Sequence, residues 1–270
     1  HWGLRILDIT DLANPVELGF HPGYSYVGDG AVAGNYVFMP AGWILGIGDV
    51  SDPSTPNPER YFDVPIYTNV AVQGNYAYAA AGSVFSVIDL SDPLQPVAAA
   101  KDTLPGLEVT QRVAVNGNYA CITEQPTNRV YVIDISNPVN PVMMGSAQTS
   151  GPLDVTMEGN YVYVAAAGWG LMVIDISDPS NPNVVAVAGD SPHPDAVAVD
   201  GNRAYVLDEI QGLYIYDVSN PAAPVLVGSI DTTSYAYDLE VTGSHVGISD
   251  VYNGLQVIDG SDPANPFLSG

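Results

Sequence analysis

This sequence of 270 residues has few cysteines, few basic residues and no long apolar run, and each of these absences argues against a structure or a function. Cys121 is the only cysteine, so no disulfide can form within the chain. Lysine and arginine number 6 against 30 acidic residues, a formal net charge of −24, so there is little to neutralise phosphate groups. Nucleic-acid binding is therefore not expected, and attraction to anionic lipid is disfavoured for the same reason. No apolar run approaches the roughly 18 residues of a membrane-spanning helix, so no membrane insertion is expected.

Recognisable catalytic motifs are also missing. The sequence contains no G-x-S-x-G, no H-E-x-x-H and no phosphate-binding glycine loop. No catalytic residue and no dedicated metal ligand is predicted from motifs.

Repetition is what the sequence has in abundance. An apolar run followed by a D-[ILV]-[ST]-[DN]-P pattern recurs seven times at intervals of 40 to 45 residues, with small departures in the first and last copies. The first Asp of the pattern stands at Asp8, Asp49, Asp89, Asp134, Asp175, Asp217 and Asp259. A second motif, G-N-Y after an alternating apolar stretch, lies between the copies and degrades in the last two of six. A fixed period across the whole chain predicts a repeat architecture.

Each period predicts four short strands, here called A to D. Examples are 70–72 for A, 76–80 for B, 171–175 for C and 224–228 for D. Their β-branched and aromatic content, bounded by Gly and Pro, favours strands, and no stretch sustains a helical period. Between A and B, Asn116-Gly117 and Asp200-Gly201 suggest two-residue hairpin turns.

Four-stranded units of this length predict an all-β fold, a β-propeller of four-stranded antiparallel blades. Strand C is almost wholly apolar, as expected of a strand covered on both faces. One position of strand B, two residues after the motif Tyr, is also expected to pack between blades. It is occupied by Phe38, Tyr78, Cys121, Tyr163 and Tyr205, so Cys121 is read as a buried hydrophobe.

The number of blades is left between six and seven. Seven C–D pairs with six A–B pairs fit a seven-bladed ring whose first blade lacks its A–B hairpin, which we favour. They also fit six closed blades with a redundant C–D piece. We expect residues 1–270 to form a single domain, within a fragment of a longer chain.

The stretches LMVIDISDP and YVYVAAAGWGL resemble the LVIVD-repeat family of bacterial and archaeal proteins, and the resemblance covers essentially the whole chain. It implies a propeller, usually on secreted or surface-attached proteins. It implies no established activity and no catalytic residues.

The B–C and D–A loops vary between repeats, whereas the A–B and C–D turns are stereotyped, so function is expected on the variable face. The three tryptophans, Trp2, Trp43 and Trp169, all stand six residues before a motif Asp, at the end of a B–C loop. Each indole either covers its own inter-blade core or forms an aromatic platform for a sugar or peptide.

A second candidate position is the residue before strand A, which is expected near the central channel. It is occupied by Asp29, Asn69, Arg112, Asp154, Ala196 and Asp238. We take Asp29, Arg112, Asp154 and Asp238 as candidate ligand-binding residues. The carboxylates could hold Ca²⁺ through oxygen ligands, or simply form a solvated polar rim; no other cofactor is expected.

The sequence favours a non-enzymatic extracellular or cell-surface scaffold that recognises a protein or carbohydrate partner through its variable face. We expect a monomer or one part of a larger multidomain chain. One alternative is a propeller enzyme, a carbohydrate-active hydrolase or lyase, with an acidic site over the central channel. The other is an architectural repeat of a surface layer or adhesin.

Overall fold

The structure, a computed structural model, describes residues 3–22, 28–41, 44–64, 69–103, 107, 109–232 and 235–270. These residues form strands joined by turns and loops, with no helix among them, and hence no helix that could cross a membrane. The strands are arranged in six four-stranded sheets and one two-stranded sheet. The predicted all-β architecture of four-stranded antiparallel blades is therefore confirmed.

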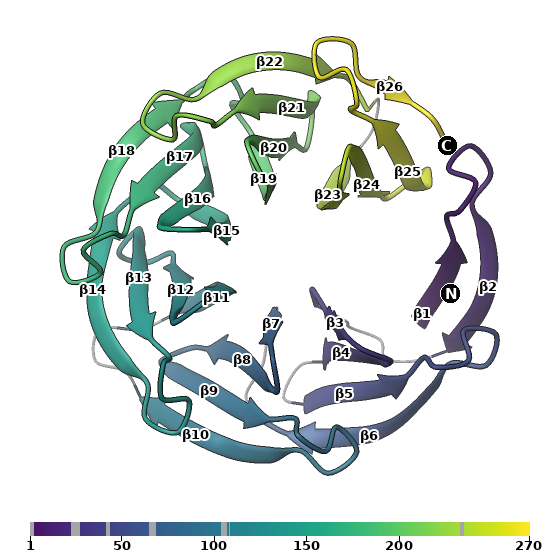
Figure 1. Cartoon of the computed structure of the whole chain (residues 1–270), viewed down its shortest axis with the longest axis vertical. Coiled ribbons are helices and arrows are strands. Elements are labelled where there is room, and N and C mark those ends of the chain that lie inside the picture. Colours follow the sequence, from purple (N-terminus) through teal and green to yellow (C-terminus); the bar gives the residue numbers. More distant parts are fainter. Residues whose placement is uncertain are drawn as a thin grey trace. The chain divides into compact units, whose positions relative to one another are not determined.

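Each four-stranded sheet is a blade of four strands consecutive in the sequence, hydrogen-bonded in the order A–B–C–D (Figure 1). The A strands are β3 (Ala31–Ala33), β7 (Val70–Gln73), β11 (Thr110–Asn116), β15 (Pro152–Glu158), β19 (Pro194–Asp200) and β23 (Ala236–Thr242). The B strands are β4 (Tyr36–Ala41), β8 (Tyr76–Ala81), β12 (Tyr119–Glu124), β16 (Tyr161–Ala166), β20 (Arg203–Asp208) and β24 (His245–Asp250). The C strands are β5 (Ile44–Asp49), β9 (Val84–Asp89), β13 (Arg129–Asp134), β17 (Gly170–Asp175), β21 (Gly212–Asp217) and β25 (Gly254–Asp259). The D strands are β6 (Asn57–Asp63), β10 (Val97–Thr103), β14 (Val142–Gln148), β18 (Asn183–Ala188), β22 (Val225–Ile230) and β26 (Phe267–Leu268).

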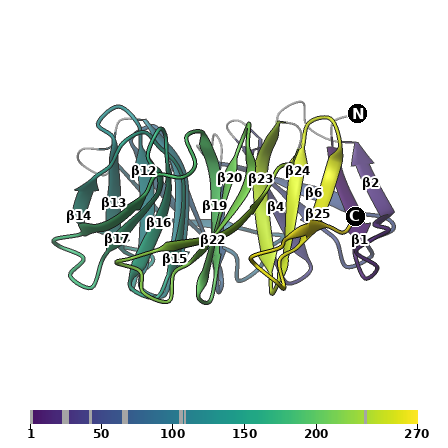
Figure 2. The same cartoon turned by 90° about the horizontal axis from the view of Figure 1, so that it is seen from above.

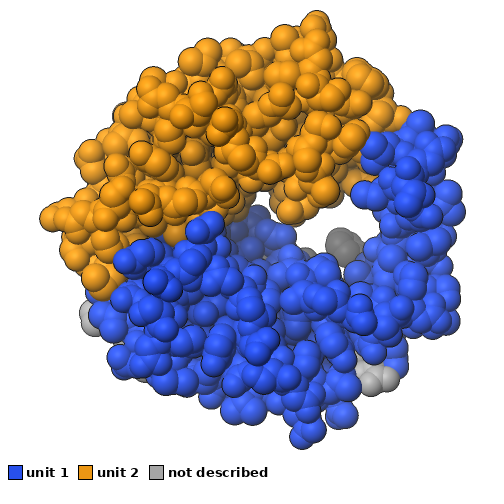
Figure 3. Space-filling model, in the orientation of Figure 1, with its two compact units in different colours: residues 1–122, 134–143 blue, residues 123–133, 144–270 orange. Residues whose placement is uncertain are grey.

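We number the blades 1 to 6 in chain order. The chain divides into two compact units, coloured separately in Figure 3: residues 1–122 with 134–143, and residues 123–133 with 144–270. Unit 1 holds the two-stranded sheet, blades 1 and 2 and part of blade 3. Unit 2 holds the remainder of blade 3 and blades 4 to 6.

The two-stranded sheet consists of β1 (Gly3–Asp8) and β2 (Val16–Pro22). Its Asp8 is the first motif Asp, so β1 and β2 are a C–D pair. The described residues thus contain six complete blades and a seventh C–D pair, as the count of motifs predicts.

The A–B turns differ by one residue from the predicted register. Asp200 pairs with Arg203, so the two loop residues are Gly201 and Asn202 rather than Asp200 and Gly201. Gly117 likewise begins the turn after β11, and both glycines have φ of +58°. Glycine with positive φ at the first loop position is the pattern of a type II′ turn, which matches the twist of the flanking strands.

The C–D loops are held by the motif Asp. In all seven copies its Oδ1 accepts a hydrogen bond of 2.8 Å from the backbone N–H two residues later, as from Ser177 to Asp175. This Asx turn is a local interaction, so it recurs wherever the motif does. It explains why a single loop sequence is repeated so closely.

The cores between blades repeat one arrangement. Two positions of strand A and two of strand B form a surface that meets the preceding blade, which we call the receiving face. It consists of Val70, Val72, Ala77 and Ala79 in blade 2, Val197, Val199, Ala204 and Val206 in blade 5, and Leu239, Val241, Val246 and Ile248 in blade 6. In the same clusters lie the strand-B aromatics of the preceding blades, Phe38, Tyr163 and Tyr205, each at most 2% exposed. Their predicted packing role between blades is confirmed.

Strand D makes a second inter-blade contact. A Cβ added to Gly228 would lie 1.8 Å from the carbonyl oxygen of Pro263, in the C–D loop of the next blade. Gly19 and Gly145 meet the equivalent loops, with closest approaches of 2.1 and 2.7 Å. Glycine at these positions lets strand D lie directly against the proline-containing C–D loop of the next blade.

Candidate functional site

The residues predicted to precede the A strands connect neighbouring blades. Asp29 and Asn69 do precede β3 and β7, but the other four lie inside A strands that begin earlier than predicted: Arg112 in β11, Asp154 in β15, Ala196 in β19 and Asp238 in β23. In unit 1, Asp29 forms an isolated parallel bridge with Asn69. Asp29 Oδ2 accepts hydrogen bonds from Asn69 Nδ2 at 3.2 Å and from Arg112 Nη1 at 3.0 Å. Asn69 Oδ1 in turn accepts the backbone N–H of Val113 at 2.8 Å. These side chains therefore link blades 1, 2 and 3.

The same position has a connecting role in unit 2. Asp154 Oδ2 accepts the backbone N–H of Val197, in the next blade, at 2.8 Å. This repeats the contact from Asn69 to Val113. Asp238 Oδ1 instead accepts the N–H of its own neighbour Leu239, at 3.0 Å. Asn69, Asp154 and Asp238 thus each accept a hydrogen bond from a backbone N–H group.

This arrangement gives little support to a Ca²⁺ site at these carboxylates. Asp29 is already compensated by the Arg112 guanidinium, and a cation beside it repels a second one. Among the described residues, no three His, Cys, Asp or Glu side chains form a group suited to a metal ion.

The position six residues before the motif Asp behaves differently from blade to blade. Trp2 and Trp43 lie outside the described residues. Trp169, at the end of the B–C loop of blade 4, is 51% exposed, so its indole is not a buried lid over the inter-blade core. Its backbone N–H donates to Ala166 O at 2.8 Å, which closes the tight turn leading into β17. The side chain is left at the surface of the variable loops.

Polar residues at this position take part in loop structure. Asn128 Oδ1 accepts the N–H of Gly151 at 3.0 Å, and Gln211 Oε1 accepts the Tyr214 hydroxyl at 2.5 Å. Asn253 lines a pocket in blade 6. The side chains of Asn128 and Gln211 thus form hydrogen bonds within their loops, whereas the indole of Trp169 is half exposed.

Three buried acids at the ends of B strands were not predicted from the sequence. Glu124, Asp208 and Asp250 are at most 7% exposed and hold the B–C loops. Asp250 Oδ1, for example, accepts the N–H groups of Tyr252 and Asn253 at 2.8 and 2.7 Å. The sequence does show that three of the six B strands end in an acid, and this recurrence could have indicated a shared structural role.

Asp208 accepts four hydrogen bonds. Its Oδ2 accepts the Ser191 hydroxyl at 2.9 Å and the His193 N–H at 2.8 Å, and its Oδ1 accepts the N–H groups of Ile210 and Gln211 at 3.0 and 2.9 Å. Burial alone would raise the pKa of Asp208, but these four donors outweigh it and hold the pKa below its ordinary value. A buried aspartate thus fixes both the B–C loop and the incoming D–A loop of blade 5.

The loops that Asp208 holds form one wall of a groove between blades 4 and 5. The groove encloses about 190 Å³. It is lined by Leu153, Ala167, Gly168, Pro192, His193, Pro194, Asp195 and Glu209. The groove carries two acids and an imidazole, and we call it the blade 4–5 groove. Trp169 directly follows the lining residue Gly168 in the sequence and is itself not one of the residues that line the groove.

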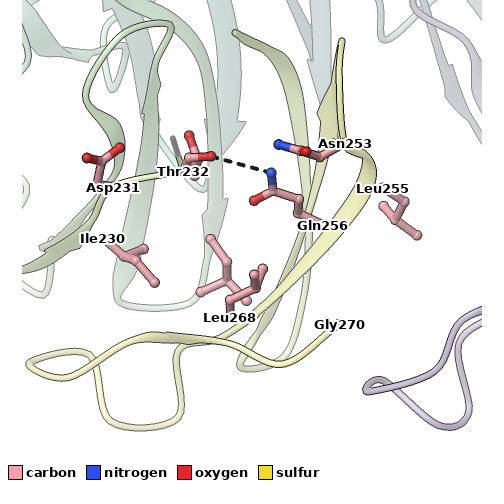
Figure 4. Close-up of a pocket in the computed structure, with 9 residues that line it drawn as sticks. Ile230, Asp231, Thr232, Asn253, Leu255, Gln256, Leu268 and Gly270 are labelled. Atoms are coloured by element: carbon pink, nitrogen blue, oxygen red, sulfur yellow. Dashed lines mark hydrogen bonds between the residues drawn. The ribbon is translucent and has the colours of Figure 1, made fainter. Parts of the chain in front are cut away.

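A larger pocket of about 360 Å³ lies beside blade 6, where Ile230, Leu255 and Leu268 are apolar walls (Figure 4). Gln256 Nε2 reaches across it to the backbone oxygen of Thr232 at 3.4 Å. Strand β26 pairs only with Ile258 and Asp259 of β25, whereas β22 pairs along β21 from Leu213 to Asp217. This pocket therefore lies along an edge of β25 whose equivalent in blade 5, the edge of β21, is covered by a longer strand D. We take it as a weaker candidate than the blade 4–5 groove, which is built from variable loops.

Both kinds of candidate loop lie at one end of the sheets. Because consecutive strands are antiparallel neighbours, the B–C and D–A loops of unit 2 are at one end of each sheet and the A–B and C–D turns at the other (Figure 2). The blade 4–5 groove, built from B–C and D–A segments, belongs to the variable end, where function was expected.

Comparison with solved structures defines the class of protein. A candidate 6-phosphogluconolactonase of Bacteroides fragilis matches with a TM-score of 0.75 and 12% identity, covering 94% of this chain and 85% of that one. One from Bacteroides uniformis matches with a TM-score of 0.76 and 16% identity, covering 94% and 86%. A protein of unknown function from Desulfotomaculum acetoxidans matches with a TM-score of 0.74 and 15% identity, covering 93% and 88%. At these identities the likeness concerns the fold, and with its repeated blades the chain is a β-propeller.

The family follows from the repeats themselves. The LVIVD repeat matches six segments that together span most of the chain: residues 25–63, 67–100, 109–149, 153–187, 193–232 and 234–270. The chain belongs to the LVIVD-repeat proteins. A comparison with curated proteins finds no match.

Proposed function

We propose that this propeller is a non-enzymatic binding module that holds a neutral carbohydrate at the blade 4–5 groove. The observation that carries the proposal is a groove bearing acids, one of whose lining residues, Gly168, is followed in the sequence by the half-exposed Trp169. Indole faces stack on the apolar faces of sugar rings, and carboxylates accept hydrogen bonds from sugar hydroxyls. We further propose that it acts outside the cell or on its surface, as the resemblance to other LVIVD-repeat proteins suggests.

The charge of the groove supports a neutral ligand over an anionic one. Asp195 and Glu209 line it, and its eight described lining residues include no lysine or arginine. The formal net charge of −24 adds a repulsive field around the whole chain. The Bacteroides proteins described above carry a phosphorylated sugar in their name, and a groove of this charge is unsuited to a phosphate. The likeness in fold is therefore not extended to that activity.

The rigidity of the groove also favours binding. Pro192 and Pro194 flank His193 and restrict the backbone of the D–A loop. The His193 N–H is bound by Asp208, and the Glu209 N–H donates to His193 O at 3.1 Å. A wall fixed before the ligand arrives reduces the entropy lost on binding.

The test is a glycan array followed by titration calorimetry on the glycan that binds best. Trp169→Ala should weaken binding by about five- to thirtyfold, since stacking of this kind is worth about 1 to 2 kcal/mol. Trp169→Phe should retain most of the affinity. The matched control is Tyr252→Ala, which removes a 74% exposed aromatic residue from the B–C loop of blade 6 and should change nothing.

Four outcomes would contradict the proposal in whole or in part. One is an array without any neutral glycan above background. Another is equal loss of affinity in Trp169→Ala and Tyr252→Ala. The third is turnover of a sugar substrate that Glu209→Gln abolishes, because the module would then be an enzyme. Binding of a peptide rather than a glycan through Trp169 would keep the groove but overturn the ligand class.

A further inference from the structure

The residues that line the blade 4–5 groove have counterparts one repeat later, between blades 5 and 6 of unit 2. A repeated hydrogen bond fixes the alignment. The Val251 N–H donates to Tyr235 O at 3.0 Å, as the N–H of Glu209 does to the oxygen of His193. Counted from this bond, the counterparts include Asp195, Glu209 and Ile210 from blade 5 and Tyr235, Tyr237 and Val251 from blade 6. We call these residues the blade 5–6 surface.

The two sides of this surface rest on one core. Ala236 is fully buried in a cluster that also contains Ala196 of blade 5. Tyr235 and Tyr237 flank Ala236 in the sequence, and Asp195 directly precedes Ala196. Strands β19 and β23 are accordingly neighbours in the ring (Figure 1). The side chains of the surface thus come together at the variable end of two adjacent blades.

The apolar members of the surface are open to solvent. Ile210, Tyr235, Tyr237 and Val251 are each between 51% and 56% exposed. Blades 5 and 6 are both complete four-stranded sheets, so this exposure arises between two fully formed blades. In the blade 4–5 groove the counterparts of the two tyrosines are His193 and Asp195, so the apolar character is particular to blades 5 and 6. Adjacent exposed side chains of this kind mark an interaction site.

The charge around these side chains is negative. Asp195 and Glu209 belong to the surface, whereas the described residues of unit 2 include two arginines and no lysine, and neither arginine lies beside it. Arg203 begins β20 directly after the A–B turn, at the opposite end of the sheet from the B–C loops. Arg129 is in blade 3, where it donates to Ser146 Oγ at 2.9 Å. Carboxylates and tyrosine ring faces both attract cations, and a planar guanidinium group can use the two at once.

We propose that the blade 5–6 surface binds an arginine-containing segment of a partner protein. The guanidinium group stacks on a tyrosine of the surface and pairs with Asp195 or Glu209. Ile210 and Val251 contact apolar parts of the same segment. A second copy of this chain is a poor occupant, because it carries a formal charge of −24 and only 6 basic residues. The proposal does not rest on carbohydrate binding in the blade 4–5 groove, although the two carboxylates belong to both.

The probe is a short labelled peptide of alternating arginine and glycine, titrated into the intact chain at physiological ionic strength. That ionic strength screens the diffuse attraction between any cationic peptide and an acidic chain. Fluorescence anisotropy should show saturable binding. The same peptide with citrulline in place of arginine keeps the planar shape and loses the charge, and it should bind at least tenfold more weakly. A lysine peptide should also bind more weakly, because an ammonium group lacks the planar face that stacks on a ring.

Tyrosine variants locate the site. Tyr235→Ala combined with Tyr237→Ala should weaken binding of the arginine peptide about fivefold or more, as expected for the loss of two exposed cation–π contacts. Phenylalanine at both positions should retain most of the binding, because the ring faces remain. The matched control is Tyr252→Ala, which removes a 74% exposed tyrosine of blade 6 outside the surface and should change nothing. All three tyrosines are exposed, so these variants should fold and should keep the melting temperature of the parent.

The proposal is overturned if the arginine peptide shows no saturable binding at millimolar concentration. Equal binding of the arginine and citrulline peptides would also overturn it, since the surface would then take an uncharged partner. Equal effects of Tyr252→Ala and the paired tyrosine variant would mean that the attraction is diffuse. Self-association of the chain that the paired variant abolishes would assign the surface to a second copy instead.

Two further measurements separate this proposal from the carbohydrate groove. Trp169→Ala should leave binding of the arginine peptide unchanged. The paired tyrosine variant should bind glycans as the parent does. Loss of peptide binding in Trp169→Ala would move the peptide to the blade 4–5 groove and overturn the assignment of the blade 5–6 surface.

Discussion

Arg112 Nη1 donates to Asp29 Oδ2 at 3.0 Å, joining two residues that are 83 positions apart in the sequence. Asn69, from the blade between them, donates to the same oxygen. The pair is partly buried, with 22% of the arginine and 28% of the aspartate side chain exposed. From the sequence, Asp29 and Arg112 were both candidate ligand-binding residues, and the structure shows that they bind each other.

We expect this pair to stabilise unit 1 by about 1 kcal/mol, more than a surface ion pair, because both groups are partly desolvated and share a third partner. A double-mutant cycle with Arg112→Met and Asp29→Asn, followed by urea unfolding, measures the coupling. Glu17→Gln, which removes the more exposed ion pair with Arg5, should cost less than about 0.5 kcal/mol. Ligand binding lost in Arg112→Met without loss of stability would point back to a binding role.

Gly228 gives a prediction about inter-blade packing. Gly228→Ala would place a methyl group 1.8 Å from Pro263 O, so strand D or the loop must move. We expect a loss of about 2 kcal/mol or more, by analogy with overpacked cores. The control is Gly189→Ala, where the closest atom to the added Cβ is 3.8 Å away and which should be tolerated. Equal melting temperatures for the two variants would show that the close approach at Gly228 is easily relieved.

Asp208 should be essential for the blade 4–5 wall. Asp208→Ala leaves the Ser191 hydroxyl and three backbone N–H groups without their acceptor, so we expect a loss of about 3 kcal/mol or more. Asp208→Asn keeps one acceptor and should lose less. Asp200→Ala, at an exposed strand end, should lie within about 0.5 kcal/mol of the parent. Chemical denaturation of the three variants ranks their free energies of unfolding. If Asp208→Ala is as stable as Asp200→Ala, Asp208 does not have the structural role assigned to it.

The sequence was sufficient for the elements that depend on local pattern. The strands follow from alternation and from Gly and Pro punctuation, and the C–D loops follow from the motif Asp and the N–H two residues later. The turn register was wrong by one residue because Asp200-Gly201 and Gly201-Asn202 are both plausible turn pairs. Only the pairing of Asp200 with Arg203 distinguishes them.

Contacts between blades were harder to predict. Nothing in the residues around Asn69 or Asp154 shows that their oxygens accept an N–H some 43 or 44 residues away. The burial of Asp208 was also invisible, because an acid at a strand end is normally solvated and only the approach of a D–A loop covers it. For the candidate site, the sequence indicated the position of Trp169, while its exposure and the blade 4–5 groove required the structure.

The response to acid follows from the motif aspartates. The backbone N–H and hydroxyl of Ser51 lower the pKa of Asp49, and equivalent donors lower the pKa of Asp8, Asp89, Asp217 and Asp259. A folded pKa below the unfolded value of about 3.9 gives stability that is complete above that value and is lost as the pH falls through the folded value. Asp208 contributes in the same direction.

We therefore expect a melting temperature that falls as the pH is lowered below about 4. Protonation also relieves the repulsion within a chain of formal charge −24, which acts in the opposite direction. Salt separates the two, since repulsion between exposed charges is screened while short hydrogen bonds are not. Melting curves between pH 7 and 2.5, at low and high salt, should show the acid loss at both salt concentrations. A melting temperature that rises below pH 4 at low salt would mean that charge repulsion outweighs the C–D loop hydrogen bonds.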